Sequence, residues 1–426
     1  MNSKPNLGNN IRLIQTFLVI VIALGVGFLF GNVYTATTQA QGGFDLPEEA
    51  EEEFEAFFQT YNLIQQQYIE DIDDITLVNG AISGMVDALD DRFSSYVDPE
   101  LFPFVDTRLS GEIEGIGAVI SVIEETNEIE IINVLPDTPA ERAGLENGDI
   151  FVLVNGDEIT GLNTTEVAAL VRGPVGTIVN LTMRRDDELL EFAIERDRIE
   201  IVSVVSEMLA NNIGYIRLAD FSVNSRRQVD EALAEFNVGE LNGLVLDLRG
   251  NPGGLLSTAT EIAGLFLEEG VILVEQFGDG EERIFEVREG VVYQIFGDGA
   301  ERVYNENAGY AGLDAPVVVL VDERSASASE LVAGTWQDNA VATIMGTVTF
   351  GKGTVQIQNT LINGGGVRLT IARWLTPNGA WITDLGITPD IIVEIPEDVE
   401  LAEGDDPQLD AAISYILEQA PVPAID

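Results

Sequence analysis

The chain has 426 residues, which is more than one ordinary hydrophobic core needs and predicts two or three domains. Its 21 basic and 73 acidic residues give a net charge of −52 at pH 7, which excludes a basic surface and predicts no binding of nucleic acid. Because it contains no cysteine and no histidine, disulfides, Cys/His zinc sites, cysteine nucleophiles and Ser-His-Asp triads are all excluded. A catalytic proton shuttle in this chain must therefore be Lys, Asp, Glu or Tyr.

The first predicted element is the apolar stretch 13–31 (LIQTFLVIVIALGVGFLFG), which follows Lys4 and Arg12. As a helix at about 1.5 Å per residue it reaches roughly 28 Å, close to the hydrocarbon thickness of a bilayer. We interpret residues 1–40 as an export signal, with a small-residue cleavage site at 38–40 (TQA), or as an uncleaved membrane anchor. A buried core helix is the alternative. The rest of the protein is therefore expected outside the cytoplasm, anchored to the cell membrane or secreted.

Two segments of different pattern follow the acidic spacer. Residues 45–107 have apolar positions at helical spacing and predict a small helical segment. From about Gly111, short β-branched runs separated by Gly, Asp and Asn predict a compact β-rich domain over 108–198, with one helix from Thr164 to Val171.

The longest region, 199–400, alternates strands with helices, as crossover α/β folds do, and is the natural place for a catalytic site. It contains the repeat FGDGEER at 277–283 and FGDGAER at 296–302, whose Asp-Gly pairs predict two hairpin turns. The oxygen ligands are not spaced as in an EF-hand. Residues 401–426 are expected to form a C-terminal helical tail.

A glycine-rich turn is the first candidate for chemistry in this region. In 245–254 (VLDLRGNPGG) an apolar strand runs into Gly250, Gly253 and Gly254 before a helix begins. A tight strand-to-helix turn is one explanation of the pattern. The other is that exposed backbone N–H groups at such a turn bind an oxyanion.

A run of serines is the second candidate. Ser325, Ser327 and Ser329 open a helix within 321–334 (VDERSASASELVAG). A serine there is usually a helix cap, and a run of Ser and Ala also suits close packing. A serine in the first turn also has the helix's free N–H groups beside it, which favours a nucleophile with an anionic intermediate. The residues alone leave all three serines as candidates for the nucleophile.

An isolated lysine is the third candidate. Lys352, within 349–356 (TFGKGTVQ), shares the chain with only one other lysine, Lys4, and the remaining 19 of the 21 basic residues are arginines. Arginine does not lose its proton in a protein, so it can replace any cation except one that must deprotonate. A structural ion pair is the alternative, but arginine would serve it equally well. The lone lysine therefore favours a general base.

A lysine that acts as a base must be neutral near pH 7, so its pKa must fall from about 10.4 to near 7. Burial and positive neighbours both lower the pKa of a lysine. The 45 residues between Asp338 and Asp384 contain no Asp or Glu, and they include Arg368 and Arg373. Buried sheet is the plainer explanation, because acids are rare there. Burial is also what the base requires.

Together these residues resemble the carboxyl-terminal processing peptidases, or tail-specific proteases, which are serine peptidases with a Ser-Lys mechanism. The resemblance spans roughly residues 50–395 in the family's order, through GAISGMVDAL, RFSSYV, SGEIEGIGAVI, TPAERAGLENGDIFVLVNG, DLRGNPGG, SASASELVAG, QDNAVATIMG, TFGKGTVQ and LGITPD. The chain departs from the family mainly in a long insertion at about 275–312, which contains the repeat.

The resemblance implies a role for each candidate residue. In the family the nucleophile is the middle serine of the run, 25 residues before the lysine, which implies Ser327 with Lys352 as the general base. Gln356 matches the residue that orients the lysine, and the two face one side of a strand. Oxyanion donors would be the N–H groups of Ala328 and of a glycine, for which Gly253 is preferred to Gly254. Glu330 and Asp338 match acidic supporting positions.

The β-rich domain resembles a PDZ module. Its carboxylate-binding loop would be Gly115-Ile116-Gly117-Ala118, whose successive N–H groups can hold a free C-terminal carboxylate while the substrate tail adds as a strand. The helix from Thr164 to Val171 would flank the peptide groove. Without the family context, residues 115–118 would be interpreted as a plain glycine turn.

The fold expected is α+β and multidomain: an N-terminal transmembrane helix or signal, a helical segment, a PDZ-like domain and a crotonase-like α/β peptidase core. The function expected is an endopeptidase that recognises unstructured apolar C-terminal tails and needs no cofactor or metal. Its expected partners are protein substrates with free C-terminal tails and, through its N-terminal segment, the membrane. The alternatives are a non-catalytic PDZ scaffold and a crotonase-class acyl-transfer enzyme.

Overall fold

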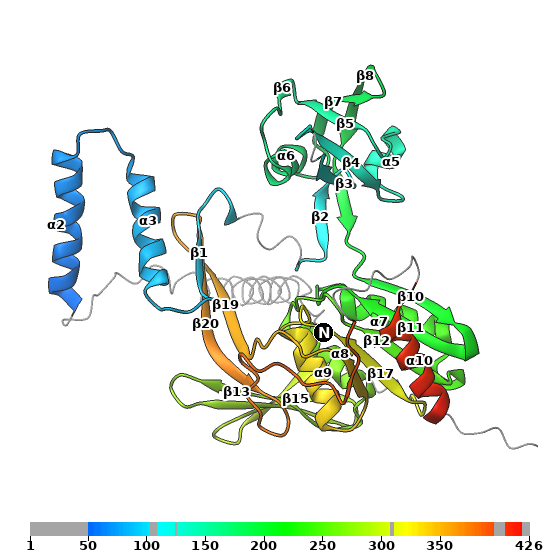
Figure 1. Ribbon diagram of the computed structural model, residues 1–426. Coiled ribbons are helices and arrows are strands. Elements are labelled where there is room, and N and C mark those ends of the chain that lie inside the picture. The colour runs from blue at the N-terminus through cyan, green and yellow to red at the C-terminus, as the bar shows by residue number, and fades with distance from the viewer. Residues whose placement is uncertain (1–49, 103–108, 124–125, 307–310, 396–404, 420–426) are drawn as a thin grey trace, which may run out of the picture. The chain divides into compact units, whose positions relative to one another are not determined.

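The computed structural model describes residues 50–102, 109–123, 126–306, 311–395 and 405–419 (Figure 1). The chain divides into two compact units, one made of residues up to 88 with 360–364 and the other of the remainder. The predicted signal or membrane segment at 13–31 lies outside the described residues. Within the described ranges, no helix is both long enough and apolar enough to cross a bilayer.

The first unit contains two helices, α2 (Glu51–Gln67) and α3 (Asp74–Asp87). Asp73 caps α3 by accepting a hydrogen bond from a backbone N–H in its first turn at 2.8 Å. The hydroxyl of Tyr61 in α2 donates to the carboxylate of Asp74 at 2.6 Å, which joins the two helices. The predicted helical segment, 45–107, contains both helices.

The β-rich domain, predicted over 108–198, has one sheet in the order β3-β4-β5-β7-β8, with β6 paired to β5, and a second sheet made of β2 and β9. Its α6 spans Thr164–Val171, as predicted, and begins with a capping box between Asn163 and Glu166. Ile131, Val167 and Met183 are fully buried in its core. Its elements are β2 (Glu112–Gly115), β3 (Ala118–Val122), β4 (Ile129–Val134), α5 (Pro139–Ala143), β5 (Ile150–Val154), β6 (Asp157–Glu158), α6, β7 (Ile178–Arg185), β8 (Glu188–Glu195) and β9 (Asp197–Glu200).

The region predicted as the catalytic core, 199–400, contains a largely parallel sheet in the order β10-β11-β12-β17-β18-β21. Only β10 runs antiparallel to its neighbour among these pairs. The central strands β12 and β17 are buried on both faces, as expected for a sheet covered by helices on both sides. They are β10 (Val204–Leu209), β11 (Ile213–Leu218), β12 (Gly243–Asp247), β17 (Val317–Val321), β18 (Thr343–Gly346) and β21 (Ile391–Ile392).

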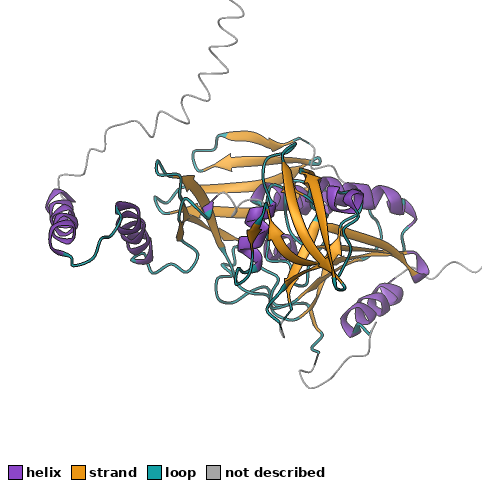
Figure 2. Ribbon diagram, turned by 90° about the horizontal axis from the view of Figure 1, so that it is seen from above, coloured by secondary structure: helices purple, strands orange, loops and turns teal. Residues whose placement is uncertain are grey.

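Helices cover the two faces of this sheet (Figures 1 and 2). Leu244 and Leu246 of β12 pack with α7, α8 and α9, whereas Val245 points to the opposite face and packs with α10. This alternation follows from the two-residue period of a strand. The helices are α7 (Ser225–Phe236), α8 (Leu256–Ala263), α9 (Ala328–Asp338) and α10 (Pro407–Gln419), with 3-10 turns η3 (Ala210–Asn212), η4 (Val238–Glu240) and η5 (Gly264–Phe266).

An antiparallel sheet in the order β1-β20-β13-β14-β15-β16 completes the core, with β19 also paired to β20. The two predicted Asp-Gly hairpin turns are confirmed: one joins β13 to β14 and the other joins β15 to β16. Gly280 and Gly299 adopt φ of 89° and 83° there, which favours glycine. The strands are β1 (Ser95–Val97), β13 (Glu269–Phe277), β14 (Glu282–Arg288), β15 (Val291–Phe296), β16 (Glu301–Asn305), β19 (Thr354–Thr360) and β20 (Gly366–Leu375).

We predict that Ile416→Ala lowers the free energy of unfolding of the core by about 3 kcal/mol, because Ile416 of α10 is 0% exposed against the parallel sheet. Leu417→Ala, at a position 43% exposed on the same helix, should cost less than about 0.5 kcal/mol. Urea unfolding followed by tryptophan fluorescence measures this, since all three tryptophans lie in the core. Equal urea midpoints of unfolding for the two variants would show that α10 does not pack against the parallel sheet.

Candidate active site

One cavity of about 450 Å³ lies where the turn after β12, the start of α9 and strand β19 meet. All the residues predicted for catalysis and for the oxyanion site line it: Ser327, Ala328, Gly253, Lys352 and Gln356. Residues up to 103 positions apart in the sequence are therefore brought to a single site.

Ser327 immediately precedes α9 and has φ 55° and ψ −111°, a conformation that non-glycine residues rarely adopt. The three candidate serines now differ. The hydroxyl of Ser325 donates to the carbonyl of Leu248 at 2.8 Å, and that of Ser329 donates to the carbonyl of Asn251 at 2.9 Å. Ser327 forms a capping box with Glu330 at the start of α9, and it alone of the three serines lines the cavity.

Lys352 lies just before β19 and is half-buried. Burial lowers the pKa of its amine to about 8, and the positive charge of Arg368 on β20 acts in the same direction. The carboxylates of Glu330 and Asp91 oppose this decrease. The Nζ atom lies 5.1 Å from the centroid of the Phe93 ring. The lysine therefore has the lowered pKa that a base needs. Part of this decrease comes from Arg368, which the sequence analysis named as a positive neighbour.

Glu330, in the first turn of α9, joins the two segments that contain Ser327 and Lys352. Its fully buried carboxylate accepts hydrogen bonds from the N–H of Ser327 at 2.7 Å and from the N–H of Lys352 at 2.9 Å. It also accepts from the N–H of Gly351 and the hydroxyl of Thr349, both at 2.6 Å. All four partners are donors, which suits an ionised carboxylate. Glu330 is thus a positioning residue for both segments.

The contacts expected between the catalytic side chains are not formed in this conformation. In the part of the chain that the structure describes, no hydrogen bond joins Ser327 to Lys352 or Lys352 to Gln356. The amide of Gln356 instead donates to Thr354 at 2.8 Å and to Thr370 at 3.2 Å. Catalytic hydrogen bonds often tighten only when substrate is bound.

The glycine turn distinguishes between the two candidate oxyanion glycines. A Cβ on Gly253 would lie 2.8 Å from the Cβ of Ser327, whereas a Cβ on Gly254 would lie 2.3 Å from the carbonyl oxygen of Phe221. Gly253 is therefore the one next to the serine. Its N–H donates to the side-chain oxygen of Asn251 at 2.9 Å. To bind an oxyanion, this N–H must either leave Asn251 or donate to both acceptors at once.

The predicted carboxylate-binding loop lines a separate cavity of about 300 Å³ in the β-rich domain. Gly115, Ile116, Gly117 and Ala118 form one wall, and α6 contributes others through residues such as Ala168. Gly117 has φ 86°, and a Cβ there would meet the Thr138 side chain at 2.4 Å, so the loop requires glycine. The remaining lining is mainly apolar.

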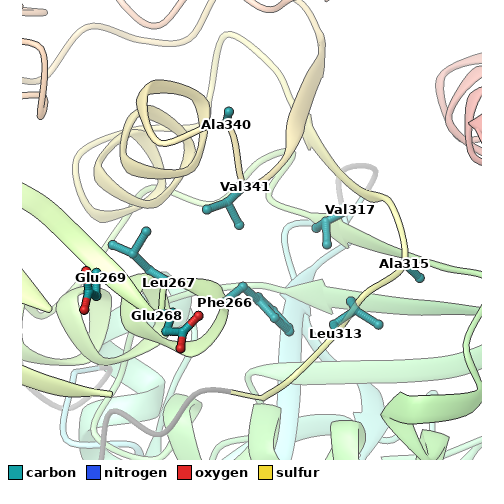
Figure 3. Close-up of a pocket in the computed structure, with 9 residues that line it drawn as sticks. All are labelled: Phe266, Leu267, Glu268, Glu269, Leu313, Ala315, Val317, Ala340 and Val341. Carbon is teal, nitrogen blue, oxygen red and sulfur yellow. The ribbon is translucent and has the colours of Figure 1, made fainter. Parts of the chain in front are cut away.

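Two further predicted residues lie outside the catalytic cavity. Asp338 is the last residue of α9 and accepts a hydrogen bond from the N–H of Asn378 at 2.8 Å. Arg373 places its guanidinium 4.8 Å from the ring centroid of Trp381 and is not a cause of the lowered pKa of Lys352. A larger open cavity of about 600 Å³ contains none of the predicted site residues (Figure 3).

Sequence reasoning missed Asp91 and Phe93, which approach Lys352 from the segment just before β1. Asp91 directly precedes the RFSSYV motif and Phe93 is its second residue; the motif entered the sequence analysis only as part of the resemblance. No local signal ties them to Lys352, because about 260 residues separate them along the chain. It also missed that Glu330 binds three backbone N–H groups.

The chain was compared with known proteins. Residues 212–393 match the model of peptidase family S41, residues 130–185 match a PDZ domain, and residues 25–101 match the activating protease CtpB N-terminal domain. Carboxy-terminal processing protease CtpA of Bacillus subtilis is 33% identical over 406 residues, which cover 95% of this chain and 81% of that one. The chain belongs to the carboxy-terminal processing proteases. These enzymes are serine peptidases.

Two further proteins are similar to this chain. The carboxy-terminal-processing protease of Bartonella bacilliformis is 36% identical over 348 residues, covering 80% of this chain and 75% of that one. A solved structure of the photosystem II D1 C-terminal processing protease is 27% identical, with a TM-score of 0.45, and covers 79% of this chain and 86% of that chain. The matches to the two family models show that the protease combines a PDZ domain with an S41 peptidase core.

We predict that Glu330→Gln lowers kcat/KM of this protease by at least about 10²-fold. The neutral amide keeps the volume of the carboxylate but weakens its charge-assisted hydrogen bonds and turns an N–H donor toward other donors. Glu323→Gln, at an exposed acid near Thr347, is the matched control and should have little effect. Peptide hydrolysis and a thermal melt of each variant measure this. An unchanged kcat/KM in Glu330→Gln would rule out the positioning role.

Proposed function

We propose that this protease cleaves proteins near their C-termini by a Ser-Lys mechanism, with Ser327 as the nucleophile and Lys352 as the general base. The observation that supports this most strongly is the lowered pKa of Lys352, in the same cavity as Ser327 with its strained backbone. The absence of histidine from the sequence leaves lysine as the base best suited to neutral pH.

The steps follow from these positions. Neutral Lys352 removes the proton from the hydroxyl of Ser327 as its Oγ attacks the substrate carbonyl. The tetrahedral oxyanion accepts hydrogen bonds from the N–H of Ala328 and from that of Gly253, which exchanges Asn251 for the oxyanion. The lysine ammonium then protonates the departing amine. A water molecule, activated by the same lysine, hydrolyses the acyl-enzyme, and Gln356 orients the amine through both halves of the cycle.

The charges around Lys352 suit both of its protonation states. With a pKa of about 8, roughly a tenth of the amine is neutral at pH 7, enough to act as a base. After it takes the proton, the carboxylates of Glu330 and Asp91 stabilise the ammonium. The neutral amine can therefore act as a base near neutral pH, and the ammonium that forms is stabilised by the neighbouring carboxylates.

We further propose that the PDZ domain selects unstructured substrates with apolar tails. The N–H groups of the loop 115–118 would hold the terminal carboxylate, and the tail would add as a strand next to β3. The mainly apolar walls of this cavity favour apolar side chains at the tail. Tail binding and cleavage then occur at two separate sites on one substrate.

The cellular location is also a proposal, and it rests on the sequence alone. The apolar stretch 13–31, between a basic start and an acidic continuation, supports an export signal or membrane anchor that places the protease outside the cytoplasm. Fractionation of cells that express the full chain would test it. Recovery of the chain in the cytosolic fraction would contradict it.

For the mechanism, kcat/KM on a neutral peptide should rise about tenfold per pH unit below pH 8 and level off above it, because the base must be deprotonated. Ser327→Ala should be inactive. Lys352→Arg should lose about 10³-fold or more at every pH, since arginine keeps its proton. The measurement is a pH–rate profile of the purified full chain. A flat profile from pH 6 to 9, or near-normal activity in Lys352→Arg, would contradict the mechanism.

For tail recognition, replacing the terminal carboxylate of an apolar-tailed substrate by an amide should raise KM by about tenfold or more, with a small change in kcat. Ala168→Asp, which places a negative charge in the PDZ cavity, should have the same effect on the acid-terminated substrate. Leu170→Asp, at an exposed position of α6 outside that cavity, is the matched control. If Ala168→Asp and Leu170→Asp have equal KM values, the tail binds elsewhere.

A further inference from the structure

The catalytic cavity contains a cation that the mechanism does not need as a reactant. Arg368 of β20 lines it and is exposed. Elsewhere in the described residues, arginines such as Arg185, Arg249 and Arg288 are paired with carboxylates. Arg368 has no carboxylate partner among the described residues, although acids outnumber basic residues 73 to 21 in the sequence. The guanidinium of Arg368 is therefore available to a ligand.

A second unused donor lies in the same cavity. Gln358 of β19 also lines it, and its Nε2 is buried without a hydrogen-bond partner. Among the described side chains it is one of two such buried atoms, the other being the hydroxyl of Thr383. A buried donor left without an acceptor is destabilising, so an acceptor supplied by a ligand would be stabilising.

The strand register places these two donors side by side. Strands β19 and β20 pair across a connection of only five residues, which makes them antiparallel. The amide of Gln356 on β19 contacts the hydroxyl of Thr370 on β20. One step of two residues further along β19 reaches Gln358, and the same step back along β20 reaches Arg368. The two side chains are therefore cross-strand neighbours on the face that lines the cavity.

We propose that Arg368 and Gln358 form a carboxylate subsite within the catalytic cavity, which binds an acidic group of the substrate near the scissile bond. A guanidinium and an adjacent amide donor match the two oxygens of a carboxylate. The subsite lies about 7 Å beyond Gln356, or about two residues along an extended substrate. This inference rests on the proposed function, because it takes Ser327 and Lys352 as the reacting groups.

The carboxylate can come from an Asp or Glu side chain or from a free C-terminus. The two sources share one chemistry and differ only in where the substrate chain ends. Either would add specificity beyond the PDZ domain, which binds a tail away from the cavity. The exposed position of Arg368 also means that its replacement should not disturb packing.

The test uses the full-length protease and peptides with one constant apolar tail. In the first series, Glu replaces Gln at each of four positions on either side of the cleaved bond. In the second, the peptide is shortened so that its own terminus falls at those positions on the leaving side, as the free acid or as the amide. The quantity compared is the ratio of kcat/KM for each charged and uncharged pair, because Arg368 also alters the pKa of Lys352 and hence absolute rates.

At one position, wild type should prefer the charged member by about tenfold. Arg368→Gln should lower this ratio below about twofold, Arg368→Glu should reverse it in favour of a Lys-containing peptide, and Gln358→Ala should reduce it partly. Arg217→Gln, at an exposed arginine of β11 outside the cavity, should keep the wild-type ratio. A preference in the first series identifies a side chain as the ligand, and one in the second identifies a terminus.

Two negative results remain distinguishable. If wild type cleaves both members of every pair equally while Ser327→Ala is inactive, the subsite is wrong and the peptidase stands. A preference that survives in Arg368→Gln also overturns the subsite. If Ser327→Ala produces the same fragments as wild type, or if wild type cleaves none of the peptides, the proposed function fails and the subsite with it.

Discussion

The buried carboxylate of Glu330 is the interaction on which the site depends. It accepts the N–H of Ser327 and that of Lys352, so one side chain sets the relative positions of two loops from different parts of the core. The same bond supports the strained backbone of Ser327, which needs surrounding contacts to persist. Substituting this acid is therefore expected to affect the proposed nucleophile and the proposed base together, without touching either side chain.

That arrangement has an electrostatic cost, because a carboxylate near Lys352 raises the pKa of the base. Burial and the charge of Arg368 outweigh Glu330 and Asp91, and the pKa of Lys352 falls to about 8. The proposed chemistry without histidine thus depends on a balance between desolvation and three neighbouring charges. In the conformation described, the amine lies over the Phe93 ring rather than against Ser327, so the dyad closes only by a change in side-chain position.

The sequence predicted the elements better than the contacts between them. The helix at Thr164–Val171 and both Asp-Gly hairpins follow from local patterns, which depend on nearby residues alone. The isolated Lys352 pointed to the cavity, but only the resemblance singled out Ser327 among three serines. Glu330 was expected only as a supporting acid. Its bonds to distant backbone N–H groups, and the approach of Asp91 to Lys352, depend on tertiary packing that no local pattern contains.

The central claim is that Lys352 is a desolvated base, and its titration can be observed directly because the chain has only two lysines. In protein labelled with ¹³C-lysine, two side-chain signals are expected in an NMR pH titration, and Lys352→Arg removes one of them. The account predicts that this signal titrates near pH 8, below the ordinary lysine value of about 10.4. Two signals that both titrate near 10.4 would contradict it.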